Sequence, residues 1–139
     1  MIVLDTNVIS EPAKPIPNQS VVAWLNAQPT KALYLTATSL AELFVGIEIL
    51  SDGKRKAQVH QRMSDLVGLF FGPRILSFDR DSAAAYALIM AQATRKGRAI
   101  SFADGQIAAI AQVHNFTVAT RDTAPFEAAG IPVINPWKL

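Results

Sequence analysis

Four carboxylates stand inside or at the end of apolar segments: Asp5, Glu42, Asp104 and Asp122. Burying one carboxylate without a partner costs several kcal/mol, so a chain that places four in apolar settings is expected to use them together. Two carboxylates about 4 Å apart repel by roughly 4 kcal/mol at an effective dielectric constant of 20. A cluster of four must therefore hold protons or bind a cation. Because carboxylate oxygens suit hard divalent ions, the four residues predict a site for Mg²⁺ or Mn²⁺.

Each acid also has a structural alternative. Asp5 could cap the short helix that follows it, and Asp122 could be a turn residue. Asp104 stands three residues after Ser101, which resembles a capping box, and an acid in a first helical turn also suits the helix dipole. Glu42 fits a structural role least, because its helix is apolar nearly all round and we expect little solvent-facing space there.

The elements that must position these acids alternate along the chain. Short apolar runs bounded by turn residues predict strands, and capped amphipathic runs predict helices. The expected strands cover residues 1–5, 32–36, 74–78, 117–120 and 131–134, the last at an edge because it contains a proline. The expected helices begin at residue 6, at 18 or 20, at 38 or 39, at 54, at 79 or 81, at 101 and near 126. We therefore expect a single α/β domain, residues 1–139, with a mostly parallel five-stranded sheet flanked by helices.

This topology predicts where the acids meet. In open parallel sheets, sites lie at the carboxyl ends of the strands. Asp5 ends the first expected strand, and Asp122 lies just past the fourth. If those strands are neighbours, their carboxylates converge, and Asp104 in the first turn of its helix can face the same crevice.

Composition sets limits on the function. Half of the 139 residues are hydrophobic and 17% are charged, which indicates a globular chain with a real core. No apolar run approaches the roughly 20 residues needed to cross a bilayer, and no basic-then-apolar leader opens the chain. The absence of cysteine excludes disulfides, thiolate zinc sites and cysteine nucleophiles, and suits the cytoplasm. A net charge of +2 permits a polyanionic partner without requiring one.

Other kinds of catalytic site find no support. The sequence has neither a Gly-x-Ser-x-Gly elbow nor a phosphate-binding P-loop. His60 and His114 share no metal-ligand spacing and are expected at the surface. The basic runs at residues 54–56 and 95–98 are interpreted first as solvated helix ends and second as phosphate contacts.

Four motifs, in this order, resemble the PIN-domain ribonucleases and, among them, the VapC-type toxins with FitB-like sequences. The motifs are Asp5-Thr6-Asn7, Ala41-Glu42-Leu43, Ala103-Asp104-Gly105-Gln106 and Thr120-Arg121-Asp122. The chain also shares the FitB-like opening Asp-Thr-Asn-Val-Ile-Ser-Glu-Pro and the later segments Val-Ala-Thr-Arg-Asp-Thr and Asn-Pro-Trp. Each motif alone is weak, whereas all four in order are specific, and the resemblance covers essentially the whole chain.

The resemblance implies a PIN-domain fold, an α/β/α sandwich, and a Mg²⁺- or Mn²⁺-dependent endoribonuclease. The family's metal-binding acids match Asp5, Glu42, Asp104 and Asp122. The hydroxyl that helps to order the family's site matches Thr120, and Thr6 follows the first acid as expected; the list of implied catalytic residues is therefore Asp5, Glu42, Asp104, Asp122, Thr120 and Thr6.

The resemblance also implies partners. It indicates the toxin of a type II toxin–antitoxin pair, which forms a homodimer and a larger complex with a VapB- or FitA-like antitoxin. DNA would be bound only through that antitoxin, and no membrane is involved. The two expected helices at residues 39–50 and 54–71 would form an apolar groove for an antitoxin segment.

Two alternatives stay open. A PIN-like domain could serve as a binding module in a DNA-binding complex, with weak or no catalysis. A phospho-acceptor receiver domain also has acids at strand ends, but it needs an adjacent acidic pair after the first strand, which Leu4-Asp5-Thr6 lacks.

Overall fold

One parallel sheet organises the chain, as the sequence predicts. The structure, a computed structural model, describes residues 1–139 and contains a five-stranded sheet in the order β3-β2-β1-β4-β5, with every strand pair parallel. The strands are β1 (Ile2–Leu4), β2 (Leu33–Thr36), β3 (Ile75–Leu76), β4 (Thr117–Ala119) and β5 (Val133–Ile134). The α-helices are α1 (Thr6–Ser10), α2 (Gln19–Ala27), α3 (Ala37–Glu48), α4 (Lys54–Asp65), α5 (Arg80–Arg95), α6 (Phe102–His114) and α7 (Ala124–Ala128).

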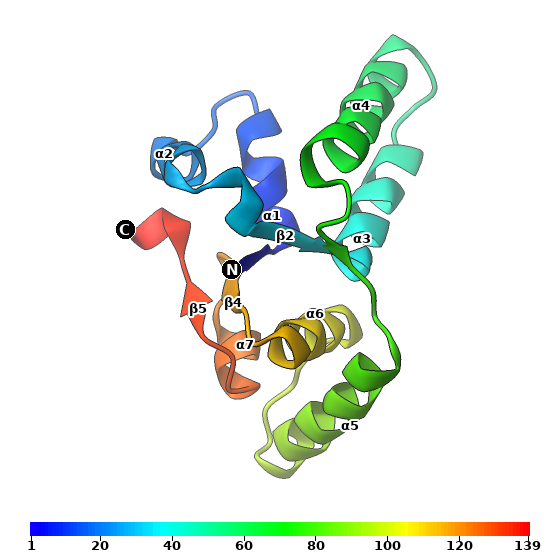
Figure 1. Cartoon of the computed structure of the whole chain (residues 1–139). Coiled ribbons are helices and arrows are strands. Elements are labelled where there is room, and N and C mark those ends of the chain that lie inside the picture. The colour runs from blue at the N-terminus through cyan, green and yellow to red at the C-terminus, as the bar shows by residue number, and fades with distance from the viewer.

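Helices cover both faces of the sheet, each over its own apolar core. Figure 1 shows α5, α6 and α7 on one side of the strands, and α1, α2 and the α3–α4 pair on the other. The first core is built around Ile107 and Phe126, and the second around Val8 and Phe71, all four fully buried. Successive strand residues point to opposite faces, and burial of both faces makes the strands apolar throughout rather than alternating.

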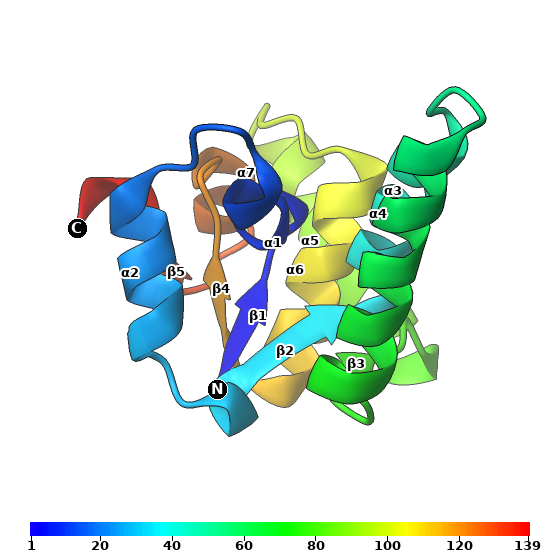
Figure 2. The ribbon, with the colours of Figure 1, turned by 90° about the horizontal axis from the view of Figure 1, so that it is seen from above.

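The central strand pair brings two of the expected site segments together. β1 pairs in parallel with β4, with Leu4 opposite Ala119, and the Asp5 N–H donates to the Ala119 carbonyl oxygen at 2.9 Å. The segments that follow the two strands therefore leave the sheet at the same carboxyl edge. In Figure 2, β1 and β4 lie side by side and point in the same direction.

Helix α6 is the most buried helix, and one glycine permits its position. Its segment from Ile107 to Ala111 is fully buried. A Cβ on Gly105 would stand 2.7 Å from the Met90 sulfur and 2.8 Å from the Tyr86 ring, so only glycine lets α6 approach α5 this closely. This contact fixes the first turn of α6, which includes Asp104.

Several predicted boundaries were wrong in detail. Helix α3 is capped by Thr36, whose Oγ1 accepts the Ser39 N–H at 3.0 Å, rather than by Thr38 or Ser39, so the helix starts directly after β2. The predicted helix over residues 54–71 is α-helical to Asp65 and continues as a π-helix, Leu66–Phe71. The other strands and helices lie where the sequence predicts them, with shorter strands at residues 75–76 and 133–134.

No helix in the structure is both long enough and apolar enough to span a bilayer.

Candidate active site

Asp5 is the most constrained of the four predicted acids. It follows β1, caps α1 and is only 6% exposed. Its Oδ1 accepts the Thr6 N–H at 2.8 Å, and its Oδ2 accepts the Thr120 hydroxyl at 2.7 Å. Asp5 can therefore cap the helix, as predicted, and also belong to an acidic site, because the cap uses only one of its two carboxylate oxygens.

Thr120 joins the two sides of this edge. It is fully buried, directly after β4, and its Oγ1 donates to Asp5 while accepting the Asp122 N–H at 3.1 Å. One hydroxyl thus orients the Asp5 carboxylate and fixes the loop that presents the Asp122 side chain. Asp122 itself is exposed.

Glu42 lies on α3, and the expectation that it has little solvent-facing space was wrong. It is exposed, because only a narrow face of α3 packs inward, where Ser39 and Ile47 are buried. Leu40 and Leu43 are partly buried against the core, whereas Phe44 and Val45, at 44% and 60% exposed, lie in solvent. Glu42 is nevertheless tied to the same edge, since its Oε1 accepts the Thr6 hydroxyl at 3.0 Å.

Asp104 occupies the first turn of α6 and is half-buried. The Ser101 hydroxyl oxygen accepts the Asp104 N–H at 3.1 Å, so Ser101 caps the helix as predicted. This bond uses the backbone N–H of Asp104. A second contact braces the helix against α3, where the Thr38 hydroxyl donates to Gln106 Oε1 at 2.8 Å.

The four acids are coupled through their charges. Burial raises the pKa of Asp5 above its ordinary value, the Thr120 and Thr6 hydrogen bonds oppose this, and the charges of Asp104 and Glu42 raise it further. Burial likewise raises the pKa of Asp104 against a hydrogen bond with Ser101, and the charge of Asp122 adds to the rise. Asp5 thus feels two of the acids, and Asp104 feels the remaining one, so the set forms one negatively charged neighbourhood.

The neighbourhood fits a divalent cation in the chemistry of its donors, and it is open in shape. All four side chains offer carboxylate oxygens, the ligands that Mg²⁺ and Mn²⁺ prefer. In the side-chain arrangement of the structure, no three carboxylate or imidazole groups converge closely enough to hold one ion. Asp5 is buried and held by two hydrogen bonds, whereas Glu42 and Asp122 are exposed and Glu42 is restrained only by the Thr6 hydroxyl. Asp5, Glu42, Asp104 and Asp122 are the residues that would hold such a cation.

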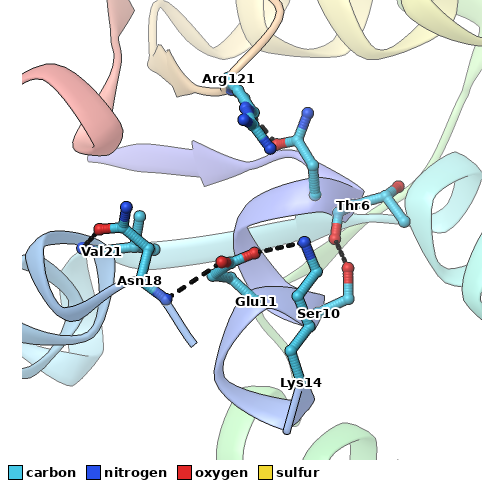
Figure 3. A network of polar contacts seen from close by, with 8 residues as sticks. Thr6, Ser10, Glu11, Lys14, Asn18, Val21 and Arg121 are labelled. Carbon is cyan, nitrogen blue, oxygen red and sulfur yellow. Dashed lines mark hydrogen bonds and ion pairs between the residues drawn. The ribbon is translucent and has the colours of Figure 1, made fainter. Parts of the chain in front are cut away.

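A second buried carboxylate lies on the same short helix segment and was missed by the sequence analysis. Glu11 is 4% exposed, and its oxygens take an ion pair from Lys14 Nζ at 2.8 Å and the Asn18 N–H at 3.1 Å. The Lys14 hydrogen bond lowers the pKa of Glu11, burial opposes it, and the Asn18 N–H and the charges of Lys14 and Arg121 lower it further. Figure 3 shows Glu11 between Lys14 and Asn18. The sequence signal was available in the Glu-x-x-Lys spacing followed by prolines.

The predicted surface histidines are exposed, and neither lies in a cluster of potential metal ligands.

Comparison with known proteins identifies the family to which this fold belongs. The sequence profile of the PIN domain family matches residues 2–131. This chain belongs to the PIN domain family. It is 50% identical over 137 residues to the toxin FitB of Neisseria gonorrhoeae, with 99% of each chain covered. It is also 50% identical over 138 residues to the VapC ribonuclease Y4jK of Sinorhizobium fredii, again with 99% of each covered.

Solved structures agree with the sequence comparison. The FitAcB crystal structure from Neisseria gonorrhoeae contains a chain that superposes with a TM-score of 0.97 at 50% identity, with both chains covered completely. A DNA-bound VapBC2 complex from Rickettsia felis contains a chain that matches with a TM-score of 0.77 at 26% identity, covering 97% of this chain and 98% of that one. The predicted PIN-domain fold is confirmed.

The largest hollow of this PIN domain lies away from the acids, between α1, α3 and α4, with a volume of about 730 Å³. Its lining is mainly apolar, with two arginines on α4. The lining residues are Ile9, Ser10, Ala13, Pro15, Leu43, Gly46, Ile47, Leu50, Arg55, Gln58, Val59, Arg62, Met63 and Leu66. Near the acids there are only smaller hollows, of about 400 Å³ beside Asp122 and about 380 Å³ beside Glu42.

Proposed function

We propose that this protein is a Mg²⁺- or Mn²⁺-dependent endoribonuclease and the toxin of a type II toxin–antitoxin pair. The observation that supports the chemistry most is the buried Asp5, held by Thr120 and facing the charges of Asp104 and Glu42 with no lysine or arginine in an ion pair with it. Such a carboxylate is unfavourable on its own and becomes favourable once a cation binds. Membership in the PIN domain family and 50% identity to a VapC ribonuclease support RNA as the substrate.

The chain's own residues would divide the work. Asp5, Glu42, Asp104 and Asp122 would hold the cation, which when bound orients the scissile phosphate, activates water and stabilises the leaving oxygen. Thr120 orients Asp5 by donating to its Oδ2, and Thr6 restrains Glu42 by donating to its Oε1. Thr120 and Thr6 are therefore positioning residues. A hydroxyl that orients a buried metal ligand, as Thr120 orients Asp5, is usually worth about 10- to 100-fold in metal affinity or activity.

A cleavage assay tests this function. The purified protein is incubated with labelled single-stranded RNA and Mg²⁺ or Mn²⁺, and in parallel with EDTA. We expect internal cleavage only where the metal is present. Folded protein that binds RNA or an antitoxin and cleaves nothing with either metal would favour the alternative, a PIN-like binding module, which the open arrangement of the four acids permits.

The proposed inhibitor is a cognate antitoxin of the VapB or FitA type, which would occupy the α1–α3–α4 groove. The relatives support this partner, because FitAB and VapBC2 have been solved as complexes, each also bound to DNA. The apolar floor of the groove suits the apolar face of a peptide segment, and Arg55 and Arg62 suit its acidic residues. We propose that DNA is bound only through the antitoxin, and that the complex works in the cytoplasm, where RNA and antitoxin meet.

We also propose that the toxin is a homodimer. Large apolar side chains stay exposed on α3 and α5, among them Ile49 at 79% and Leu88 at 67%, and soluble monomers rarely expose such patches. A two-fold dimer would cover them. Light scattering at micromolar concentration should give twice the chain mass, and the mass should rise again when antitoxin is added. A monomer under both conditions would contradict this arrangement.

A further inference from the structure

Arg121 stands between two residues of the acidic edge, and its guanidinium lies over the Trp137 ring. Thr120 precedes it and Asp122 follows it. Its backbone is held from both directions, since its N–H donates to Asn7 Oδ1 at 3.3 Å and its carbonyl oxygen accepts from Asn135 Nδ2 at 3.5 Å. In Figure 3, Arg121 reaches from the loop after β4 toward α1. These bonds hold the Arg121 backbone beside the segment that follows Asp5.

The guanidinium of Arg121 lies on an aromatic face and keeps its hydrogen-bond donors free. Its Cζ is 5.4 Å from the centre of the Trp137 ring. The ion pairs of the chain are Lys14–Glu11, Lys56–Glu48 and Lys56–Asp52, so Arg121 is in none of them. Nor does its side chain donate any hydrogen bond within the chain. Stacking engages the face of a guanidinium and leaves the N–H groups at its edge for another ligand.

Glu11, an acid that feels the charge of Arg121, already has other partners. Glu11 takes Lys14 and the Asn18 N–H as its partners, and Arg121 is left exposed. A planar, fixed and unpaired guanidinium matches the bidentate geometry of a phosphate. It stands beside a cluster of four acids that would otherwise repel a polyanion.

We propose that Arg121, held on Trp137, binds a phosphate of the RNA backbone next to the bond that is cut. This inference rests on the proposed ribonuclease function. RNA would approach with its scissile phosphate at the acids and a neighbouring phosphate on Arg121. Trp137 is then a positioning residue, which fixes the guanidinium by stacking.

The test is RNA binding in an uncleaving background. Asp5→Asn protein is titrated with a fluorescent single-stranded RNA of mixed sequence at several salt concentrations, with and without the further change Arg121→Gln. We expect Arg121→Gln to weaken binding about tenfold and to reduce the slope of log K against log salt by about 1. Arg80→Gln is the matched control. It removes one positive charge from the first residue of α5, an arginine that is exposed and in no ion pair. This change should affect the RNA affinity and the salt slope much less.

Two further variants separate phosphate binding from a purely structural clamp on the C-terminus. Arg121→Lys keeps the charge, so it should keep the salt slope and recover part of the affinity. Trp137→Leu should weaken RNA binding while leaving the slope near that of the parent. Arg121→Gln protein that binds RNA like the Arg80→Gln control overturns the inference, as does a loss of binding that only accompanies a fall in Tm and is equal for glutamine and lysine.

The outcomes also distinguish this inference from the function beneath it. Cleavage by the wild-type chain together with normal RNA binding by Arg121→Gln overturns the inference alone. Neither cleavage nor RNA binding by the wild-type chain overturns the ribonuclease function and the inference with it.

Discussion

Two carboxylates, Asp5 and Glu11, lie six residues apart and are almost equally buried, at 6% and 4% exposed. The pKa of Asp5 is raised, by burial first, and the pKa of Glu11 is lowered, by Lys14 first. Burial alone therefore does not decide the state of an acid. Glu11 has a lysine and a backbone N–H and ties the proline-rich connection to the helix before it. Asp5 has two hydrogen-bond donors and acidic neighbours, and it is in no ion pair with a lysine or arginine.

The largest difference between the two acids should appear in catalysis. Asp5→Asn keeps the shape of the side chain and removes the charge, so we expect it to abolish metal-dependent RNA cleavage. Glu11→Gln should cleave at close to the wild-type rate, because Glu11 contacts none of the acids of the site. Both are assayed on labelled RNA after identical purification, with circular dichroism to check the fold. An active Asp5→Asn enzyme would remove Asp5 from the site.

The next largest effect is expected at Thr120, whose hydroxyl donates to Asp5. Thr120→Val deletes the bond to Asp5 Oδ2 and the acceptor for the Asp122 N–H. We expect cleavage to fall by about 10- to 100-fold, the usual range for a residue that orients a metal ligand. Thr120→Ser restores the hydroxyl and should recover most of the rate. If valine and serine are equally impaired, the methyl packing matters and the hydroxyl does not.

A smaller effect should appear in stability, with opposite signs for the two acids. Because the folded-state pKa of Glu11 is lowered, its stabilisation is present above its pKa in the unfolded chain and is lost as the pH falls through the folded value. The pKa of Asp5 is raised, so its contribution is present below the unfolded value and is lost as the pH rises through the folded value. At neutral pH in EDTA, Glu11→Gln should therefore lower Tm by a few degrees, and Asp5→Asn should leave it unchanged or raise it.

A pH series sharpens this contrast. Glu11→Gln should lose less stability than the wild type on acidification, because the ion pair to be lost is already gone. Asp5→Asn should lose more, because it lacks the relief that protonation of Asp5 brings. The measurement is Tm by differential scanning fluorimetry in EDTA, from neutral pH down through the lowered pKa of Glu11. Parallel curves for the three proteins would show that the two carboxylates do not differ in the folded state.

The smallest expected effect is at Thr6, whose hydroxyl bonds an exposed Glu42. Exposed hydrogen bonds contribute little, so Thr6→Val should slow cleavage only a few-fold, measured as kcat/KM on the same RNA. A loss as large as that of Thr120→Val would mean that Glu42 must be held as firmly as Asp5.

The features that depend on the order of elements along the chain could be predicted from the sequence. Strand–helix alternation gives a parallel sheet, and Asp5 and Asp122 follow neighbouring strands, so their meeting at one edge could be predicted. The burial of individual side chains could not be predicted, because it depends on which face of each helix packs against the sheet. Glu42 was expected to be shielded by its apolar helix, but the outer face of α3 is in solvent. Glu11 was missed because its burial depends on Lys14 and on a loop that returns at Asn18.

The central claim is that the four acids act together as one cation site built on Asp5. Measuring Tm during a Mn²⁺ titration tests it most directly, because an ion that binds only the folded state raises Tm increasingly as its concentration exceeds its Kd. The account predicts a concentration-dependent rise for the wild type and for Glu11→Gln, and little or no rise for Asp5→Asn and Asp104→Asn. Equal rises in all four proteins would show that Mn²⁺ binds elsewhere and would contradict the account.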